Sequence, residues 1–212
     1  MYSESRPITD SAARSRSGGV AGNARLTAAA AAALLLLLAI EGATIPFIGS
    51  LIGPHIFVGM LLIPPVLLKL ASTGYRFARY YTGRPAYVRK GPPPWLMRLL
   101  APGVVLSTLA LFGTGVALLA VGPDTGHLVL LHKASFIIWF GLMAVHVLGH
   151  LLEMSRLALP DWRRSAGREA ALAGSGQRLA LLGTSLLAGV ALAVATYSLA
   201  APWLSTGLGG SS

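Results

Sequence analysis

Five long apolar segments, separated by polar connections, dominate the hydropathy pattern of this chain. A helix that crosses a bilayer needs about 20 consecutive apolar residues, and each of these segments reaches that length. They cover residues 27–49, 53–74, 98–121, 127–152 and 178–203. The pattern therefore predicts an all-α integral membrane protein with five transmembrane helices.

The overall composition agrees with that prediction. The chain of 212 residues is 54% apolar and 11% charged, with a mean hydropathy of +0.68. Residues 1–25 are an exception, because they are rich in Ser, Arg and Gly and carry few apolar side chains. We expect a disordered cytoplasmic tail over residues 1–25 and a single membrane domain over residues 26–205.

The basic residues fall on one side of the predicted bundle. Thirteen of the seventeen lie before the first apolar segment, between the second and third, or between the fourth and fifth; Lys69, Arg98 and Arg178, near the segment ends that adjoin those connections, bring the number on this side to sixteen. The opposite connections, at 49–53 and 121–126, contain none. The positive-inside rule then places the N-terminus in the cytoplasm and the C-terminus outside. The net charge of +10 is thus a topology signal, which favours contact with anionic membrane lipid and argues against a nucleic-acid partner.

The connection between the second and third segments has an unusual composition. Its sequence, GYRFARYYTGRPAYVRKGPPP, carries four tyrosines among five basic residues. Aromatic and basic side chains gather at the headgroup level of a membrane, which predicts a segment lying at that interface. A quinone-binding or partner-binding surface is the alternative.

Four of the five histidines, His127, His132, His146 and His150, lie in the fourth apolar segment. Ionisable residues inside a membrane helix are costly, which makes them candidates for function. His132 and His146 are fourteen residues apart, so they share a helix face about 21 Å apart. His55 begins the second helix at the outer side and so lies at the depth of His132. Two imidazoles from facing helices are the usual axial ligands of a b-type haem, which needs no cysteine, and this chain has none.

Two further residues fit a haem site at that outer level. Gly59 follows His55 by about one helical turn and would let a macrocycle approach the backbone. Lys133 is the one basic residue on the outer side, where it can pair with haem propionates. His127 lies about 140° around the helix from His132, so we expect it to point away from the site.

The inner level offers a less complete ligand set. No other helix offers a histidine at the depth of His146. Lys69, fourteen residues after His55, is on a suitable face to pair with it, either as a ligand or within a proton or quinone site. Alternatively, His146 and His150, at i and i+4, could hold a divalent metal ion together with Glu153 at i+7.

Glu41 is the one acidic residue inside the first apolar segment. A carboxylate exposed to lipid is costly, so we expect this side chain to face the bundle and to hold a proton. It is a candidate for a proton or quinone site near the outer histidine pair.

Several stretches together resemble a known family. The sequence GPHIFVGMLLIPPVLLKLASTGYRFARYYTG, then KGPPP, LHKASFIIW and HVLGH, resembles the membrane cytochrome b subunits of respiratory formate dehydrogenases and nickel–iron hydrogenases, within the cytochrome b561-like superfamily. The resemblance covers about residues 27–152. It implies a four-helix haem-binding bundle in which His55 is one ligand of the outer haem and the fourth helix supplies His132 and His146.

The chain departs from that family in two places. The first helix of the formate dehydrogenase subunit carries the other ligand of the inner haem, whereas this chain has alanine and leucine there. One haem b is therefore expected and a second is an alternative. The fifth helix has no counterpart in the four-helix core.

The resemblance implies a membrane-bound b-type cytochrome in the plasma membrane of a bacterium. It would carry electrons between the quinone or menaquinone pool and an extracytoplasmic oxidoreductase subunit, such as a molybdenum-cofactor enzyme. The chain would then be an electron-transfer subunit rather than a stand-alone enzyme. Two other classes are open: a haem-free transporter that uses the histidines for metal or proton binding, and an assembly or anchor subunit.

Overall fold

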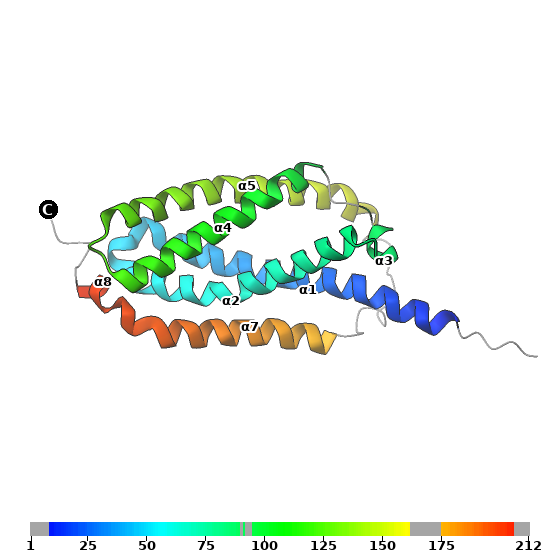
Figure 1. Cartoon of the computed structure of the whole chain (residues 1–212), viewed down its shortest axis with the longest axis horizontal. Helices are drawn as coiled ribbons and strands as arrows, with labels where there is room; N and C mark the ends of the chain where they lie inside the picture. The colour runs from blue at the N-terminus through cyan, green and yellow to red at the C-terminus, as the bar shows by residue number, and fades with distance from the viewer. Residues whose placement is uncertain (1–8, 90, 92–94, 162–174, 206–212) are drawn as a thin grey trace, which may run out of the picture.

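The computed structural model describes the backbone of residues 9–89, 91, 95–161 and 175–205, and the side chains of residues 23–89, 91, 95–149 and 177–205. All the regular structure in these residues is helical, which confirms the all-α prediction, and none of them lies in a strand (Figure 1). The helices are α1 (Thr9–Thr44), η1 (Ile45–Phe47), α2 (Ile48–Tyr81), α3 (Pro85–Val88), α4 (Trp95–Val121), α5 (Gly126–Asp161), α7 (Ser175–Thr196), η2 (Tyr197–Ala200) and α8 (Ala201–Ser205).

Four stretches of the described chain are long and apolar enough to cross a membrane. They are Asn23–Tyr81, Trp95–Val121, Gly126–Gly149 and Gln177–Ser205. The first of them has 59 residues and contains α1, η1 and α2. These two long helices lie side by side, because the chain reverses at η1 (Figure 1).

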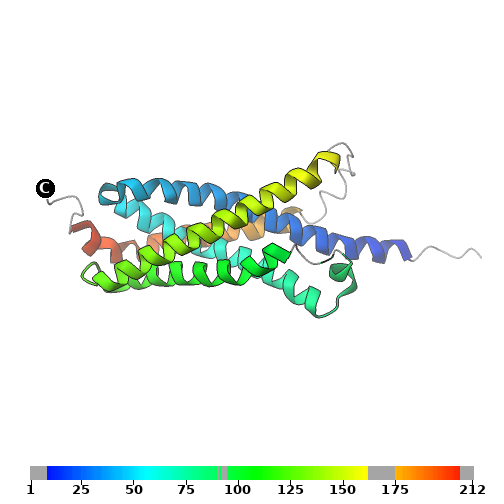
Figure 2. The same cartoon turned by 90° about the horizontal axis from the view of Figure 1, so that it is seen from above.

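The helices form two groups. In the first, α2 packs along α1 on one side and along α7 on another. The contact with α7 is close, since a Cβ at Gly189 would lie 2.3 Å from the carbonyl oxygen of Leu61. In the second group, α4 and α5 form an antiparallel hairpin. This hairpin and α7 lie on opposite sides of the α1–α2 pair (Figure 1), and α5 crosses the other helices obliquely (Figure 2).

Few large side chains are buried in this arrangement. The core between α2 and its neighbours contains Met60, Leu119, Ala193 and Ala200. By contrast, Leu36, Phe140 and Leu187 are among many apolar side chains that face outward. An apolar exterior of this extent is expected where lipid replaces water as the solvent of the helices.

Three helices extend beyond the predicted segments. Helix α1 already begins at Thr9, so most of the stretch expected to be a disordered tail is helical, while residues 1–8 lie outside the described part. Alanine and arginine are good helix formers, and a helix already nucleated in the apolar segment extends through them without a second nucleation step. Helix α2 continues to Tyr81 and α5 to Asp161. In α2 the extension ends at Gly83, which has a φ of +71°, followed by Pro85.

The chain reversals determine which residues meet. Within α2 the backbone leaves helical geometry at Leu51 (φ −110°, ψ 18°), three residues before Pro54, whose ring clashes with the preceding turn of a helix. The reversal at η1, the α4–α5 turn and α8 all lie at one end of the molecule, whereas α3 lies at the other (Figure 1). Residues at the end of α1, the start of α2 and the start of α5 are thereby brought to one level.

Candidate functional site

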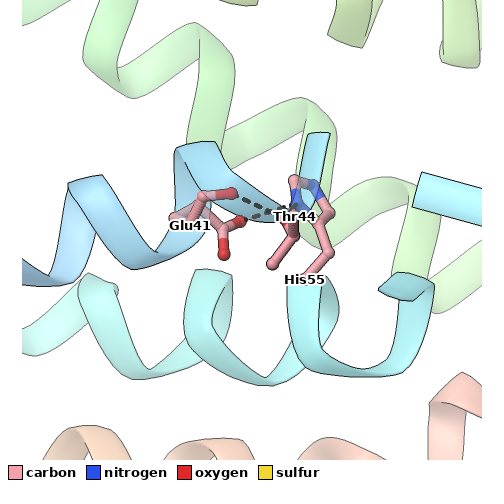
Figure 3. A network of polar contacts seen from close by, with 3 residues as sticks. All are labelled: Glu41, Thr44 and His55. Atoms are coloured by element: carbon pink, nitrogen blue, oxygen red, sulfur yellow. Dashed lines mark hydrogen bonds and ion pairs between the residues drawn. The ribbon is translucent and has the colours of Figure 1, made fainter. Parts of the chain in front are cut away.

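The reversal at η1 places two residues of α1 against His55 of α2. The Glu41 Oε1 atom lies 3.0 Å from His55 Nδ1, and Thr44 Oγ1 lies 2.9 Å from the same nitrogen. Figure 3 shows both α1 side chains directed at the imidazole ring. Thr44 is buried, and the Glu41 and His55 side chains are only 15% and 23% exposed.

These contacts favour one tautomer of His55 when Glu41 is ionised. The Thr44 hydroxyl donates its single hydrogen to the backbone oxygen of Glu41, at 2.6 Å. Its oxygen can then only accept from the imidazole, and an ionised Glu41 carboxylate is likewise only an acceptor. In the state with Glu41 ionised, the hydrogen of His55 sits on Nδ1 and Nε2 carries a lone pair. No hydrogen bond among the described residues uses that Nε2 atom.

The second histidine of the predicted pair is held in the same way. His132, on α5, has its Nδ1 atom 3.0 Å from Thr114 Oγ1 of α4. The Thr114 hydroxyl donates to the Ala110 carbonyl at 2.8 Å, so it accepts from His132 Nδ1. Gly115 gives the ring room, since a Cβ there would lie 3.2 Å from His132 Cε1. With Nδ1 as the donor, His132 also carries its lone pair on Nε2.

The two imidazoles, one from each group of helices, lie close to each other. Their ring centroids are 6.5 Å apart and their planes are inclined at 81°. A metal ion bound about 2 Å from the Nε2 atom of each imidazole would separate the centroids by roughly 6 Å. The spacing therefore fits one metal centre with two imidazole ligands, and each ring is anchored through Nδ1 to its own group of helices.

The donor set restricts which kind of metal centre could bind at this pair. Among the residues whose side chains are described, no three His, Cys, Asp or Glu residues form a cluster that could hold an ion. Glu41 is directed at Nδ1 of His55 and so lies on the far side of the ring from Nε2. Two axial imidazoles without a third protein ligand suit a metal whose other positions are filled by a macrocycle, as in haem.

The second carboxyl oxygen of Glu41 makes no hydrogen bond to His55. Its Oε2 atom is buried and has no hydrogen-bond partner among the described residues. Gly59 lies against the same carboxyl group, because a Cβ there would lie 3.3 Å from Glu41 Oε1. The structure thus places Gly59 beside Glu41. The space that the missing side chain leaves, which we expected to admit a macrocycle, is next to the Glu41 carboxyl group instead.

The other predicted site residues lie apart from this pair. His127 and Lys133 are exposed, and Lys133 adjoins His132 in the chain. His146 is half-buried further along α5. Lys69 donates from Nζ to the backbone oxygen of Thr27 on α1, at 2.9 Å, so its ammonium group is directed at α1. The side chains of His150 and Glu153 lie outside the described residues.

Comparison of the chain with protein-family models, with curated proteins and with solved structures yields no match. The functional assignment consequently depends on the site itself.

Proposed function

We propose that this protein is a membrane-bound b-type cytochrome in which His55 and His132 are the axial ligands of one haem b. The observation that carries the proposal is the pair of imidazoles 6.5 Å apart, each with Nδ1 hydrogen-bonded to a threonine of a neighbouring helix. Two histidines are the whole protein ligand set of such a cofactor. Bound there, the haem would supply a one-electron redox couple.

The chain's own residues have separate roles in this proposal. The imidazoles bind the iron through Nε2. Thr44 and Thr114 fix the rings in the required tautomer by accepting from Nδ1, which also raises the basicity of the ligands. Glu41 accepts from the Nδ1 atom of His55 and adds negative charge beside that ligand when it is ionised. Lys133 is the proposed partner of acidic groups on the cofactor.

The proposed setting is the plasma membrane of a bacterium, with five crossings. The stretch Asn23–Tyr81 supports two of them, because it is 59 residues long and reverses at η1. The distribution of arginine and lysine supports a cytoplasmic N-terminus and an external C-terminus. The histidine pair then lies toward the outer surface, where the chain would pass electrons between quinone and an extracytoplasmic oxidoreductase.

A second candidate function has one observation in its favour. The buried Oε2 atom of Glu41, without a partner among the described residues, is typical of a group that binds a proton or a cation along a transport path. A haem-free transporter of this kind would lack visible absorbance, whereas a cytochrome would not.

The haem content of the purified protein tests the proposal. The full chain, expressed with an adequate haem supply, should show a Soret band and sharp α and β bands on reduction with dithionite. A pyridine haemochrome assay should give one haem b per chain. Colourless protein that is nonetheless helical and monodisperse would contradict the cytochrome and favour the transporter.

A further inference from the structure

The end of the molecule opposite the histidine pair concentrates arginine and tyrosine. It is formed by the last two turns of α2, the turn that follows, α3 and the first turn of α4. We call it the arginine–tyrosine end. Its arginines are Arg76, Arg79, Arg84, Arg89 and Arg98, and its tyrosines are Tyr75, Tyr80, Tyr81 and Tyr87.

Contacts among the tyrosines and arginines fix the shape of this end. The Tyr75 and Tyr87 rings meet edge to face with centroids 6.2 Å apart, which holds α3 against α2. The Arg79 guanidinium lies 4.9 Å from the centroid of the Tyr75 ring. Arg98 donates from Nη2 to the Tyr81 hydroxyl at 2.9 Å, which ties the start of α4 to the end of α2.

The positive charge of this end is not balanced within the surrounding sequence. No aspartate or glutamate occurs between residues 42 and 123. Partial burial and the neighbouring Tyr75 raise the pKa of the Tyr87 hydroxyl above its usual value, so this phenol is neutral at physiological pH. Arg84, Arg89 and Arg98 are exposed. Among the residues whose side chains are described, no ion pair involves these arginines.

The surroundings of the arginines indicate what kind of molecule could bind there. Large apolar side chains at the same end are exposed, with Phe77 at 63%, Trp95 at 75% and Leu99 at 71%. Aromatic rings beside arginines, at the end of apolar helices, are characteristic of the headgroup level of a bilayer. A phospholipid offers both kinds of group at this level, because its acyl chains adjoin a phosphodiester.

We propose that the arginine–tyrosine end binds the phosphodiester headgroups of anionic phospholipids in preference to zwitterionic ones. The planar guanidinium donates two parallel hydrogen bonds to a phosphate, and the extra negative charge of an anionic lipid is attracted by the unbalanced cations. The exposed Phe77 and Trp95 rings contact the acyl region beside it. This inference does not rest on the haem assignment.

Lipid retention by the full-length protein tests the inference. Purified protein in detergent is equilibrated with equal amounts of phosphatidylglycerol and phosphatidylcholine of different acyl mass, and the retained lipids are counted by native mass spectrometry. The wild type should retain phosphatidylglycerol over phosphatidylcholine by about threefold or more. In the double variant Arg84→Gln/Arg89→Gln the ratio should fall to near one.

Two controls keep that result interpretable. Both arginines are exposed, so the double variant should keep the wild-type circular dichroism and melting temperature in detergent without added lipid. The charge-conserving variant Arg84→Lys/Arg89→Lys should keep most of the preference, because both lipids carry the phosphodiester and the positive charge is what selects the anionic one. A wild type that retains both lipids equally, or a glutamine variant with the wild-type ratio, would overturn the inference.

Discussion

The α1–α2 pair carries a polar cluster near each end, and the two clusters differ in what they leave available. We call them the inner and outer clusters, after the orientation proposed above; the inner cluster joins Asn23 and Thr27 of α1 to Lys69 and Ser72 of α2. Lys69 Nζ donates to Thr27 O at 2.9 Å, Asn23 Nδ2 donates to Ser72 O at 3.1 Å, and the Thr27 and Ser72 hydroxyls are 3.0 Å apart. Its polar groups are therefore directed at one another.

The outer cluster is open on one side. Glu41 and Thr44 occupy only Nδ1 of His55, which leaves Nε2 facing away from them, and Glu41 Oε2 has no partner among the described residues. A second imidazole, from another pair of helices, lies 6.5 Å from the first. The hydrogen bonds of the inner cluster join two helices. The outer cluster instead leaves nitrogen and oxygen atoms that can bind a ligand. That contrast favours a single haem at the outer level.

Among variants that keep both imidazoles, the largest expected effect comes from removing the hydrogen bonds that orient the rings. Thr44→Val and Thr114→Val each remove an acceptor from Nδ1 while keeping the side-chain volume close to wild type. Each variant should lose haem about 10–100-fold more readily, measured as the rate of transfer to excess apomyoglobin. Thr44→Ser and Thr114→Ser keep the hydroxyl and should restore most of the retention. Valine variants that hold haem as tightly as the wild type would show that the threonines are only packing residues.

An intermediate effect is expected at the inner cluster. Lys69→Met removes the bond to Thr27 O and should lower the melting temperature in detergent by a few degrees, corresponding to about 1 kcal/mol for this half-exposed group. The visible spectrum should be unchanged. A loss of about half the haem absorbance would instead identify Lys69 as a ligand of a second haem and would erase the contrast between the two clusters.

The smallest expected effect is at His146. With one haem at the outer level, His146→Ala should leave the haem-to-protein ratio at one and the α band in place. A ratio that falls from two to one would require a second haem with His146 as a ligand. The pyridine haemochrome assay distinguishes these outcomes directly.

The long apolar helices can be predicted from the sequence, whereas the side-chain contacts of the candidate site cannot. The segments 98–121 and 127–152 anticipate α4 and most of α5, because the length of an apolar run is strongly constrained by a bilayer. The helical start at Thr9 was missed, because a polar composition does not exclude helix when a stable helix follows it.

Some features of the candidate site can likewise be predicted from the sequence and others cannot. Helix periodicity places His55 and His132 at one depth, but the rotation of each helix about its axis decides whether the rings meet. Thr44 and Thr114 could not be identified, because each contacts its histidine from a different helix, and Thr114 lies 18 residues before His132. The contact of Glu41 with His55 likewise depends on the geometry of the reversal at η1.

The low-spin signature of the haem in ligand variants tests the central claim most directly. Removing one imidazole from a six-coordinate haem opens a coordination position. His55→Ala and His132→Ala should each convert the iron to a high-spin form or abolish haem binding, while His127→Ala, a histidine exposed on the same helix as His132, should leave the spectrum unaltered. Full wild-type low-spin absorbance in both ligand variants would contradict the assignment of this pair.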